Sequence, residues 1–268
     1  MIGLNTFINV PLAIEMEYLQ AIIPTMIIEY KNSAIISARE IEIQFANSIN
    51  NQYELKNGVK TPVVVDILGA ITKYSSWSGV GTTYIGHILR ALDTDEDVSG
   101  IVLNIDSGGG MVSGTAELTN IIKNLQKPTI SYTSGYQCSA ALDIASGCDY
   151  HMASPYADLI GSIGTMLSYQ DFSAMFEKWG AKIYNLYAPQ STEKNKEFRE
   201  LMKGNEELYN ERLKVLADDF ITRMKENYGS DLKDDGKVFK GKTYTPQEAL
   251  AIGLIDELGT IDDALAKF

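Results

Sequence analysis

The sequence is poor in the residues that build disulfides and metal centres. Only two cysteines, Cys138 and Cys148, and two histidines, His87 and His151, occur in its 268 residues. Two thiols are too few for a disulfide framework or a four-ligand zinc site, and two imidazoles do not change that. We therefore expect no metal centre and no other cofactor.

Positive charge and long apolar runs are also scarce. The 23 lysines and arginines face 35 aspartates and glutamates, which gives a net charge of -12. Such a surface repels phosphates. The charge therefore argues against a general nucleic-acid binder and against a protein that binds anionic membrane surfaces. Glu15, Glu17 and Glu29 interrupt the early apolar segments, and no signal-peptide pattern precedes them. We expect no membrane span and a cytoplasmic location.

Strand and helix patterns alternate along most of the chain. Residues 63–68 form a short apolar run typical of a buried strand, and the apolar positions between residues 85 and 92 follow helical spacing. Further strands are predicted at 101–105, 129–133, 150–153 and 182–187, with helices between them. This alternation predicts an α/β fold with a mainly parallel sheet. Residues 1–51 show no clear period, so we predict an accessory N-terminal segment there and one main domain at 52–268.

A glycine-rich turn follows the predicted strand at 101–105. It reads Asp106-Ser107-Gly108-Gly109-Gly110 and lies at the carboxyl edge, where parallel sheets bind ligands. Its glycines would let backbone N–H groups approach a substrate, either as a phosphate cradle or as an oxyanion hole. The longer phosphate-loop signatures are missing, which weakens the first possibility. From these residues alone, a plain tight turn is as good an explanation as a functional loop.

A second turn of this kind places Ser139 at the start of a predicted helix. The helix dipole would favour developing negative charge there, although a serine that only caps the helix is the commoner case. Two consecutive strand-to-helix turns would lie side by side at one edge of the sheet. Together they could supply a nucleophile and two oxyanion donors.

The serine hydroxyl would need a base, and the histidines fit that role poorly. His87 lies off the apolar stripe of its helix, and His151 lies in a short strand, where a structural role is favoured. A lysine can act instead if burial lowers its pKa towards neutrality. Lys194 and Lys196 lie in a polar loop before a long predicted helix. From the residues alone, each is more simply explained as a solvated charge.

Four short motifs, in their order and spacing, resemble the signal peptide peptidase A family, which includes the phage minor capsid protein C proteases. They are residues 105–110 (IDSGGG), 138–141 (CSAA), 160–164 (IGSIG) and a C-terminal stretch at 240–259. The resemblance covers residues from about 60 to 265. It implies a Clp protease/crotonase-like spiral of ββα units, a serine endopeptidase with a Ser/Lys dyad, and a homo-oligomer. The main domain at 52–268 would then be the Ser/Lys protease domain.

Carried over position by position, the resemblance implies that Ser139 is the nucleophile and Lys194 the base, with Lys196 as the runner-up. It also implies that the backbone N–H groups of Gly109 and Ala140 form the oxyanion hole and that Ser162 supports the site. Two departures stand out. Gly108 replaces the usual proline of the family, and the lysine loop is longer than in the phage proteins and lacks their histidine.

The resemblance also implies protein or peptide substrates. The membrane-anchored N-terminus of the bacterial enzymes is not recognisable, which favours the phage branch, with capsid or scaffold proteins as substrates in the cytoplasm or within a procapsid. Two alternatives remain. A crotonase-like acyl-CoA hydratase or hydrolase would need an acidic pair and a coenzyme A site, and a catalytically dead, capsid-associated structural protein would need no base.

Overall fold

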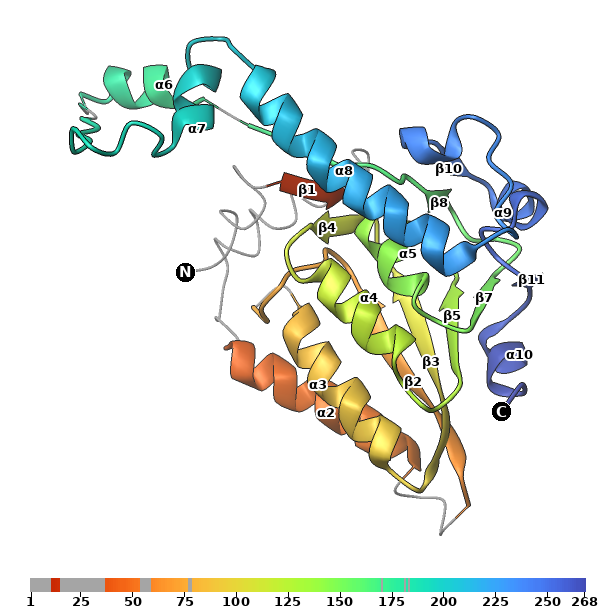
Figure 1. The fold of residues 1–268 in the computed structure, drawn as a ribbon. Helices are drawn as coiled ribbons and strands as arrows, with labels where there is room; N and C mark the ends of the chain where they lie inside the picture. Colours follow the sequence, from red (N-terminus) through yellow and green to blue (C-terminus); the bar gives the residue numbers. More distant parts are fainter. Residues whose placement is uncertain are drawn as a thin grey trace.

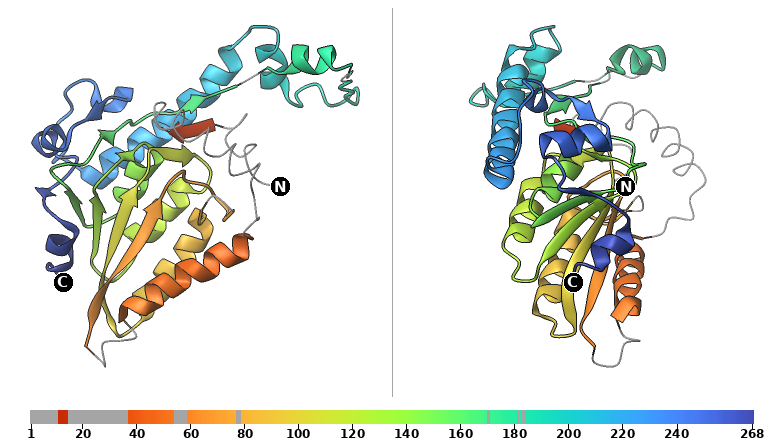
Figure 2. Two further views of the ribbon diagram at one scale, coloured as in Figure 1. Left: turned by 180° about the vertical axis from the view of Figure 1, so that it is seen from behind. Right: turned by 90° about the vertical axis from the view of Figure 1, so that its right-hand side faces the viewer.

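A parallel sheet forms the centre of the computed structural model (Figures 1 and 2). The structure describes residues 11–14, 37–53, 59–76, 79–169, 171–180, 182 and 184–268. The sheet has the strand order β11-β7-β5-β3-β2, and each neighbouring pair is parallel. Its strands are β2 (Thr61–Leu68), β3 (Val98–Asp106), β5 (Thr129–Thr133), β7 (Tyr150–Ala153) and β11 (Glu257–Leu258). The predicted α/β class and four of the five predicted strands agree with this sheet.

The burial of the strands explains their nearly continuous apolar sequences. In the central strand β3, Ile101, Val102, Leu103 and Ile105 are all buried. Strands that are covered on both faces lose the alternation of apolar and polar residues. The helices α3 (Thr82–Thr94), α4 (Thr115–Lys123) and α5 (Ala140–Ala145) lie on one side of the sheet, and α10 (Ile261–Leu265) lies on the other (Figure 2).

Helix α2 (Ala38–Tyr53) lies along the outer edge of β2. The side chain of Gln52 accepts a hydrogen bond from the N–H of Val64 at 2.8 Å and donates one to its C=O at 2.9 Å. Ile49 is buried in the same apolar cluster as the β2 side chains, so the helix protects the edge from further pairing. The boundary predicted between residues 51 and 52 falls inside this helix.

Two small sheets follow the carboxyl ends of the central strands. One has the order β4-β1-β9, from β4 (Gly109–Met111), β1 (Pro11–Ile14) and β9 (Met166–Leu167). The other has the order β10-β8-β6, from β10 (Thr243–Tyr244), β8 (Ile160–Gly161) and β6 (Gln137–Cys138). Because β4, β6 and β8 directly follow β3, β5 and β7 in sequence, both sheets gather at one edge of the central sheet.

An arm projects from this body and carries the predicted lysine loop (Figures 1 and 2). It consists of α6 (Ser173–Lys178), α7 (Lys196–Leu201) and the first part of α8 (Glu207–Tyr228), and only the second half of α8 has buried residues. The strand predicted at 182–187 is wrong, because residues 182 and 184–187 form no strand. An extended run needs a partner strand, and Leu186, which is 94% exposed, has none in the described part of the chain.

The C-terminal region closes the body with short elements. A 3-10 helix (Val238–Lys240) precedes β10, and helix α9 (Pro246–Ile252) begins with a capping box in which Thr245 and Glu248 bond each other's backbone N–H groups. Over the residues whose positions are given, no helix is both long and apolar enough to cross a membrane.

Candidate active site

The two strand-to-helix turns predicted to meet do lie side by side. The N–H of Ser107 donates to the carbonyl of Tyr136 at 2.8 Å, and the N–H of Cys138 donates to the carbonyl of Ser107 at 3.1 Å. The carboxylate of Asp106 accepts the N–H of Tyr136 at 2.9 Å. Gly135 packs so closely on Asp106 that a Cβ there would lie 2.4 Å from the carboxylate. The glycine turn and the serine turn therefore form one rigid unit.

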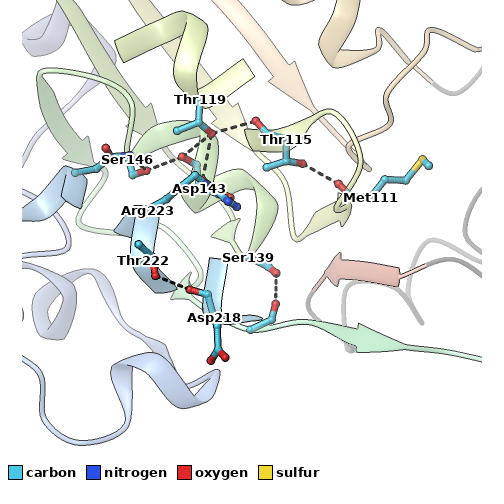
Figure 3. A network of polar contacts seen from close by, with 11 residues as sticks. Met111, Thr115, Thr119, Ser139, Asp143, Ser146, Asp218, Thr222 and Arg223 are labelled. Carbon is cyan, nitrogen blue, oxygen red and sulfur yellow. Dashed lines mark hydrogen bonds and ion pairs between the residues drawn. The ribbon is translucent and has the colours of Figure 1, made fainter. Parts of the chain in front are cut away.

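Ser139 has a strained backbone at the junction of β6 and α5. Its φ is 56° and its ψ is -118°, and its side chain makes no capping hydrogen bond to the helix. Its hydroxyl donates instead to the carbonyl of Gly164 at 3.5 Å (Figure 3). A non-glycine residue in such a conformation, at a sharp strand-to-helix turn, is typical of a nucleophile rather than a cap.

In the glycine turn, the N–H groups of Gly109 and Gly110 point in different directions. The N–H of Gly109 already donates to the hydroxyl of Ser107 at 3.0 Å. Ile71 lies along the opposite edge of β4. Its N–H donates to the carbonyl of Gly109, and its carbonyl accepts the N–H of Met111. Because backbone groups alternate in direction along a strand, the N–H of Gly110 points away from Ile71 and faces β1. Gly110 is therefore better placed than Gly109 to bind a developing oxyanion.

The second predicted donor lies at the start of α5. Ala140 is the first helical residue, so its N–H has no acceptor within the helix. The positive end of the helix dipole points in the same direction. The described geometry thus agrees with the N–H of Ala140 as one half of an oxyanion hole.

The third motif of the sequence supports Ser139 through the backbone. The carbonyl of Gly161 accepts the N–H of Ser139 at 2.8 Å. Ser162 follows with a φ of 58°, and its N–H donates to the carbonyl of Lys242 at 2.9 Å. A Cβ at Gly161 would lie 2.5 Å from that same carbonyl. Ser162 therefore lies next to the serine turn and joins it to the C-terminal motif.

The predicted lysines do not reach Ser139 within one chain. Lys194 is exposed in the turn before α7, and Lys196 is paired with Glu193 at 2.8 Å. Figures 1 and 2 show α7 on the arm, far from α5. Among the residues that the structure describes, the hydroxyl of Ser139 has no lysine partner.

The histidines have other roles, as the sequence indicated for His151. Nδ1 of His151 lies 3.0 Å from the hydroxyl of the buried Ser131, and the ring packs on Tyr228. Burial lowers the pKa of His151, so its neutral form is favoured. His87 is exposed on α3. Neither ring bonds Ser139 in the described structure.

Comparison with known proteins identifies the chain. A family model described as "Peptidase family S49" matches residues 122–268, which is more than half of the sequence. The chain belongs to peptidase family S49. A protease of Methanocaldococcus jannaschii is 27% identical over 186 residues, covering 69% of this chain and 60% of the relative. Capsid assembly protease C of Escherichia phage lambda is 28% identical over 218 residues, covering 80% of this chain and 49% of the relative.

A solved structure shares the fold of this S49 chain. It is a variant of the 1510-N membrane-bound stomatin-specific protease in complex with a substrate peptide. It matches with a TM-score of 0.51 and 19% identity, covering 79% of this chain and 81% of that chain. The predicted Clp protease/crotonase-like α/β fold is confirmed. The chain spans only about half to three fifths of the two sequence relatives just named, so their activities do not pass to it directly.

Helix α5 of the S49 domain is held from behind by a buried ion pair (Figure 3). The guanidinium of Arg223 on α8 donates to the carboxylate of Asp143 at 2.7 Å and 3.3 Å. Thr119 on α4 donates to the same carboxylate at 3.2 Å. Burial raises the pKa of Asp143, while Arg223 opposes that change. This network fixes the helix whose first turn carries Ser139.

Removal of the guanidinium should therefore destabilise the fold in a pH-dependent way. We expect Arg223→Met to lower the free energy of unfolding by about 3–5 kcal/mol at neutral pH, because the buried carboxylate of Asp143 loses its partner. The folded pKa of Asp143 would then lie still further above its unfolded value. Stability should be retained below the unfolded pKa, near pH 4, and lost as pH rises through the folded pKa. Urea unfolding at several pH values measures this loss.

The matched control for this substitution is Lys214→Met, also on α8. Lys214 pairs with Asp218 at the exposed surface, where an ion pair contributes little. We expect no comparable pH-dependent change. A penalty for Arg223→Met that is the same at every pH would contradict the assigned role of the pair.

The close packing of Gly110 gives a second prediction. A Cβ at this position would lie 2.1 Å from the carbonyl oxygen of Ile71, which is backbone and cannot rotate away. We expect Gly110→Ala to displace β4 and to lower both cleavage activity and peptide affinity at least tenfold, since the overpacked strand must move. Activity and affinity equal to those of the parent protein would show that the position of β4 is unimportant.

Proposed function

We propose that this chain is a serine endopeptidase in which Ser139 is the nucleophile and Lys194 of a neighbouring copy is the base. The observation that carries the proposal is the strained, uncapped conformation of Ser139 between two turns with inward-facing backbone N–H groups. The match to the S49 family model, which spans residues 122–268 and so includes Ser139, supports the same assignment.

A second copy is proposed because the arm is unsuited to remain exposed. Seven large apolar side chains of the arm and its flanks are exposed, with Trp179 at 72% and Leu186 at 94%. The others are Phe172, Met175, Phe176, Tyr184 and Met202. Apolar surface gathered in this way is typical of a protein contact site. An arm that docks on a neighbour would carry its lysine loop towards that neighbour's α5.

Lys194 is favoured over Lys196 by their surroundings. Lys196 is paired with Glu193, whereas Lys194 is exposed and makes no ion pair with any described residue. Burial of Lys194 between two copies would remove water from the ammonium group and favour the neutral amine. A neutral amine is what a general base requires.

The reaction then has two stages. The amine of Lys194 takes the proton of the Ser139 hydroxyl as Oγ attacks the peptide carbonyl carbon. The N–H groups of Gly110 and Ala140 bind the oxyanion, and losing one such donor typically costs about 10²–10³-fold in turnover. Collapse breaks the C–N bond, the leaving amine takes the proton from Lys194, and an acyl-enzyme remains. Water attacks the ester, which releases the second product and restores the hydroxyl.

The substrate class is proposed from the relatives. The lambda relative is named as a capsid assembly protease, so capsid or scaffold proteins are the proposed substrates and the procapsid the proposed place of action. The test is to incubate the purified protein with an unfolded protein and with candidate capsid proteins, and to read the fragment masses. Defined fragments support the proposal, and intact substrates after long incubation with an assembled oligomer contradict it.

A further inference from the structure

Residues 11–14 of the chain lie in an unexpected place beside the nucleophile. As β1 they pair with two strands at once, both antiparallel (Figure 1). On one side Leu12, Ala13 and Ile14 lie opposite Met111, Gly110 and Gly109. On the other side Pro11 and Leu12 lie opposite Leu167 and Met166 of β9. No sequence pattern predicted this strand, because the early segment has no regular period.

The two partners of β1 are the strands that flank the candidate nucleophile. β4 continues the glycine turn, which is bonded to the serine turn through Ser107. β9 follows Gly164, whose carbonyl accepts the hydroxyl of Ser139. An extended peptide inserted between β4 and β9 would gain main-chain hydrogen bonds on both edges, which is how sheets recognise peptides. The groove between them is therefore suited to a strand, and β1 fills it.

The register of β1 brings one of its carbonyl groups opposite the proposed oxyanion donor. The strand runs from Pro11 to Ile14, and its C-terminal end lies opposite Gly109, at the end of β4 nearest the glycine turn. The backbone of Ala13 lies opposite Gly110, whose N–H faces β1. The carbonyl of Ala13 is thus the β1 carbonyl closest in register to the proposed oxyanion donor.

We propose that residues 11–14 act as an inhibitory strand, which occupies the peptide groove in the register of a substrate and which an extended peptide must displace. The inference rests on the proposed function only in taking Ser139 as the centre of the groove. A strand that belongs to the same chain as its groove competes with added peptides at a high effective concentration. Its few paired residues still allow displacement by a longer peptide.

The test uses the full chain with Ser139→Ala, so that binding is measured without cleavage. The probe is a fluorescein-labelled synthetic peptide with the sequence of residues 8–17, and its affinity is read from fluorescence anisotropy. Ala13→Pro removes the N–H that faces β4 and should release the tethered strand. Ala13→Ser keeps that N–H and is the matched control.

We expect the probe to bind the proline variant about tenfold more tightly than the serine variant, if the strand fills the groove about nine-tenths of the time. Amide exchange at Gly110, whose N–H faces β1, should rise in the proline variant alone. Cleavage after Ala13 would remove residues 1–13. Such a loss from protein that retains Ser139, but not from the Ser139→Ala variant, would also support a strand that lies in the groove. Equal affinities together with equal exchange would overturn the proposal.

These outcomes are separate from those of the proposed function. An affinity difference without any cleavage by the protein that retains Ser139 would contradict the proposed peptidase activity and support the inhibitory strand. Cleavage of added substrates with no affinity difference would contradict the inhibitory strand and support the proposed peptidase activity.

Discussion

Replacement of Ser139 by alanine is expected to reduce peptide cleavage by about 10⁴-fold or more, as loss of the nucleophile does in other serine peptidases. The hydroxyl makes one long hydrogen bond, of 3.5 Å, and no cap, so the fold loses little when it is removed. Alanine at a φ of 56° is no more strained than serine. Thermal unfolding should therefore stay close to that of the parent protein while turnover is lost.

The matched control for Ser139 is Ser134→Ala. Ser134 lies in the same turn, but its side chain is exposed. We expect normal turnover from this variant. Retained cleavage by the Ser139→Ala protein, from a preparation free of other proteases, would remove Ser139 from the mechanism.

Lys194→Ala is expected to lower turnover by about 10²–10⁴-fold, the usual contribution of a general base. Lys196→Ala is its matched control, since Lys196 lies two residues away in the same loop and is paired with Glu193. The control should lose little activity, because an exposed ion pair contributes little. A large loss for Lys196→Ala with a small one for Lys194→Ala would reverse the assignment.

Mixing two inactive variants tests whether the base acts between copies. Copies with Ser139→Ala and copies with Lys194→Ala, dissociated and reassembled together, should regain roughly a quarter of the parent activity, because random neighbours in a heterologous ring combine an intact serine with an intact lysine that often. If both residues act within one chain, no mixed pair restores a complete site. Mixed assembly without any recovered activity would contradict the arrangement across copies.

Much of the fold could be predicted because local patterns agree with it. The strands at 101–105 and 129–133 are rich in β-branched and aromatic residues, and the parallel sheet buries nearly all of them. The capping box at Thr245 and Glu248 could be read from residue types alone. The meeting of the two turns followed from the right-handed connections of such sheets, and the hydrogen bonds of Ser107 confirm it.

Sequence patterns were least informative where the structure depends on distant partners. Residues 182–187 have a strand-like composition, but residues 182 and 184–187 have no neighbouring strand in the described part of the chain. The motif predicts Gly109 as an oxyanion donor and we propose Gly110; no sequence pattern could guide that choice, because the directions of the two N–H groups depend on Ile71, which lies 38 and 39 residues earlier in the chain. The positive φ of Ser139 likewise has no marker in the sequence.

The most direct measurement of the central claim is the site of acylation during turnover. The protein is mixed with an activated peptide ester, quenched with acid within seconds, digested, and analysed by mass spectrometry. We predict that the acyl group is found on the fragment that contains Ser139, and that Ser139→Ala protein carries none. An acyl group on a different residue, or steady turnover with no acylated protein at any quench time, would contradict the account.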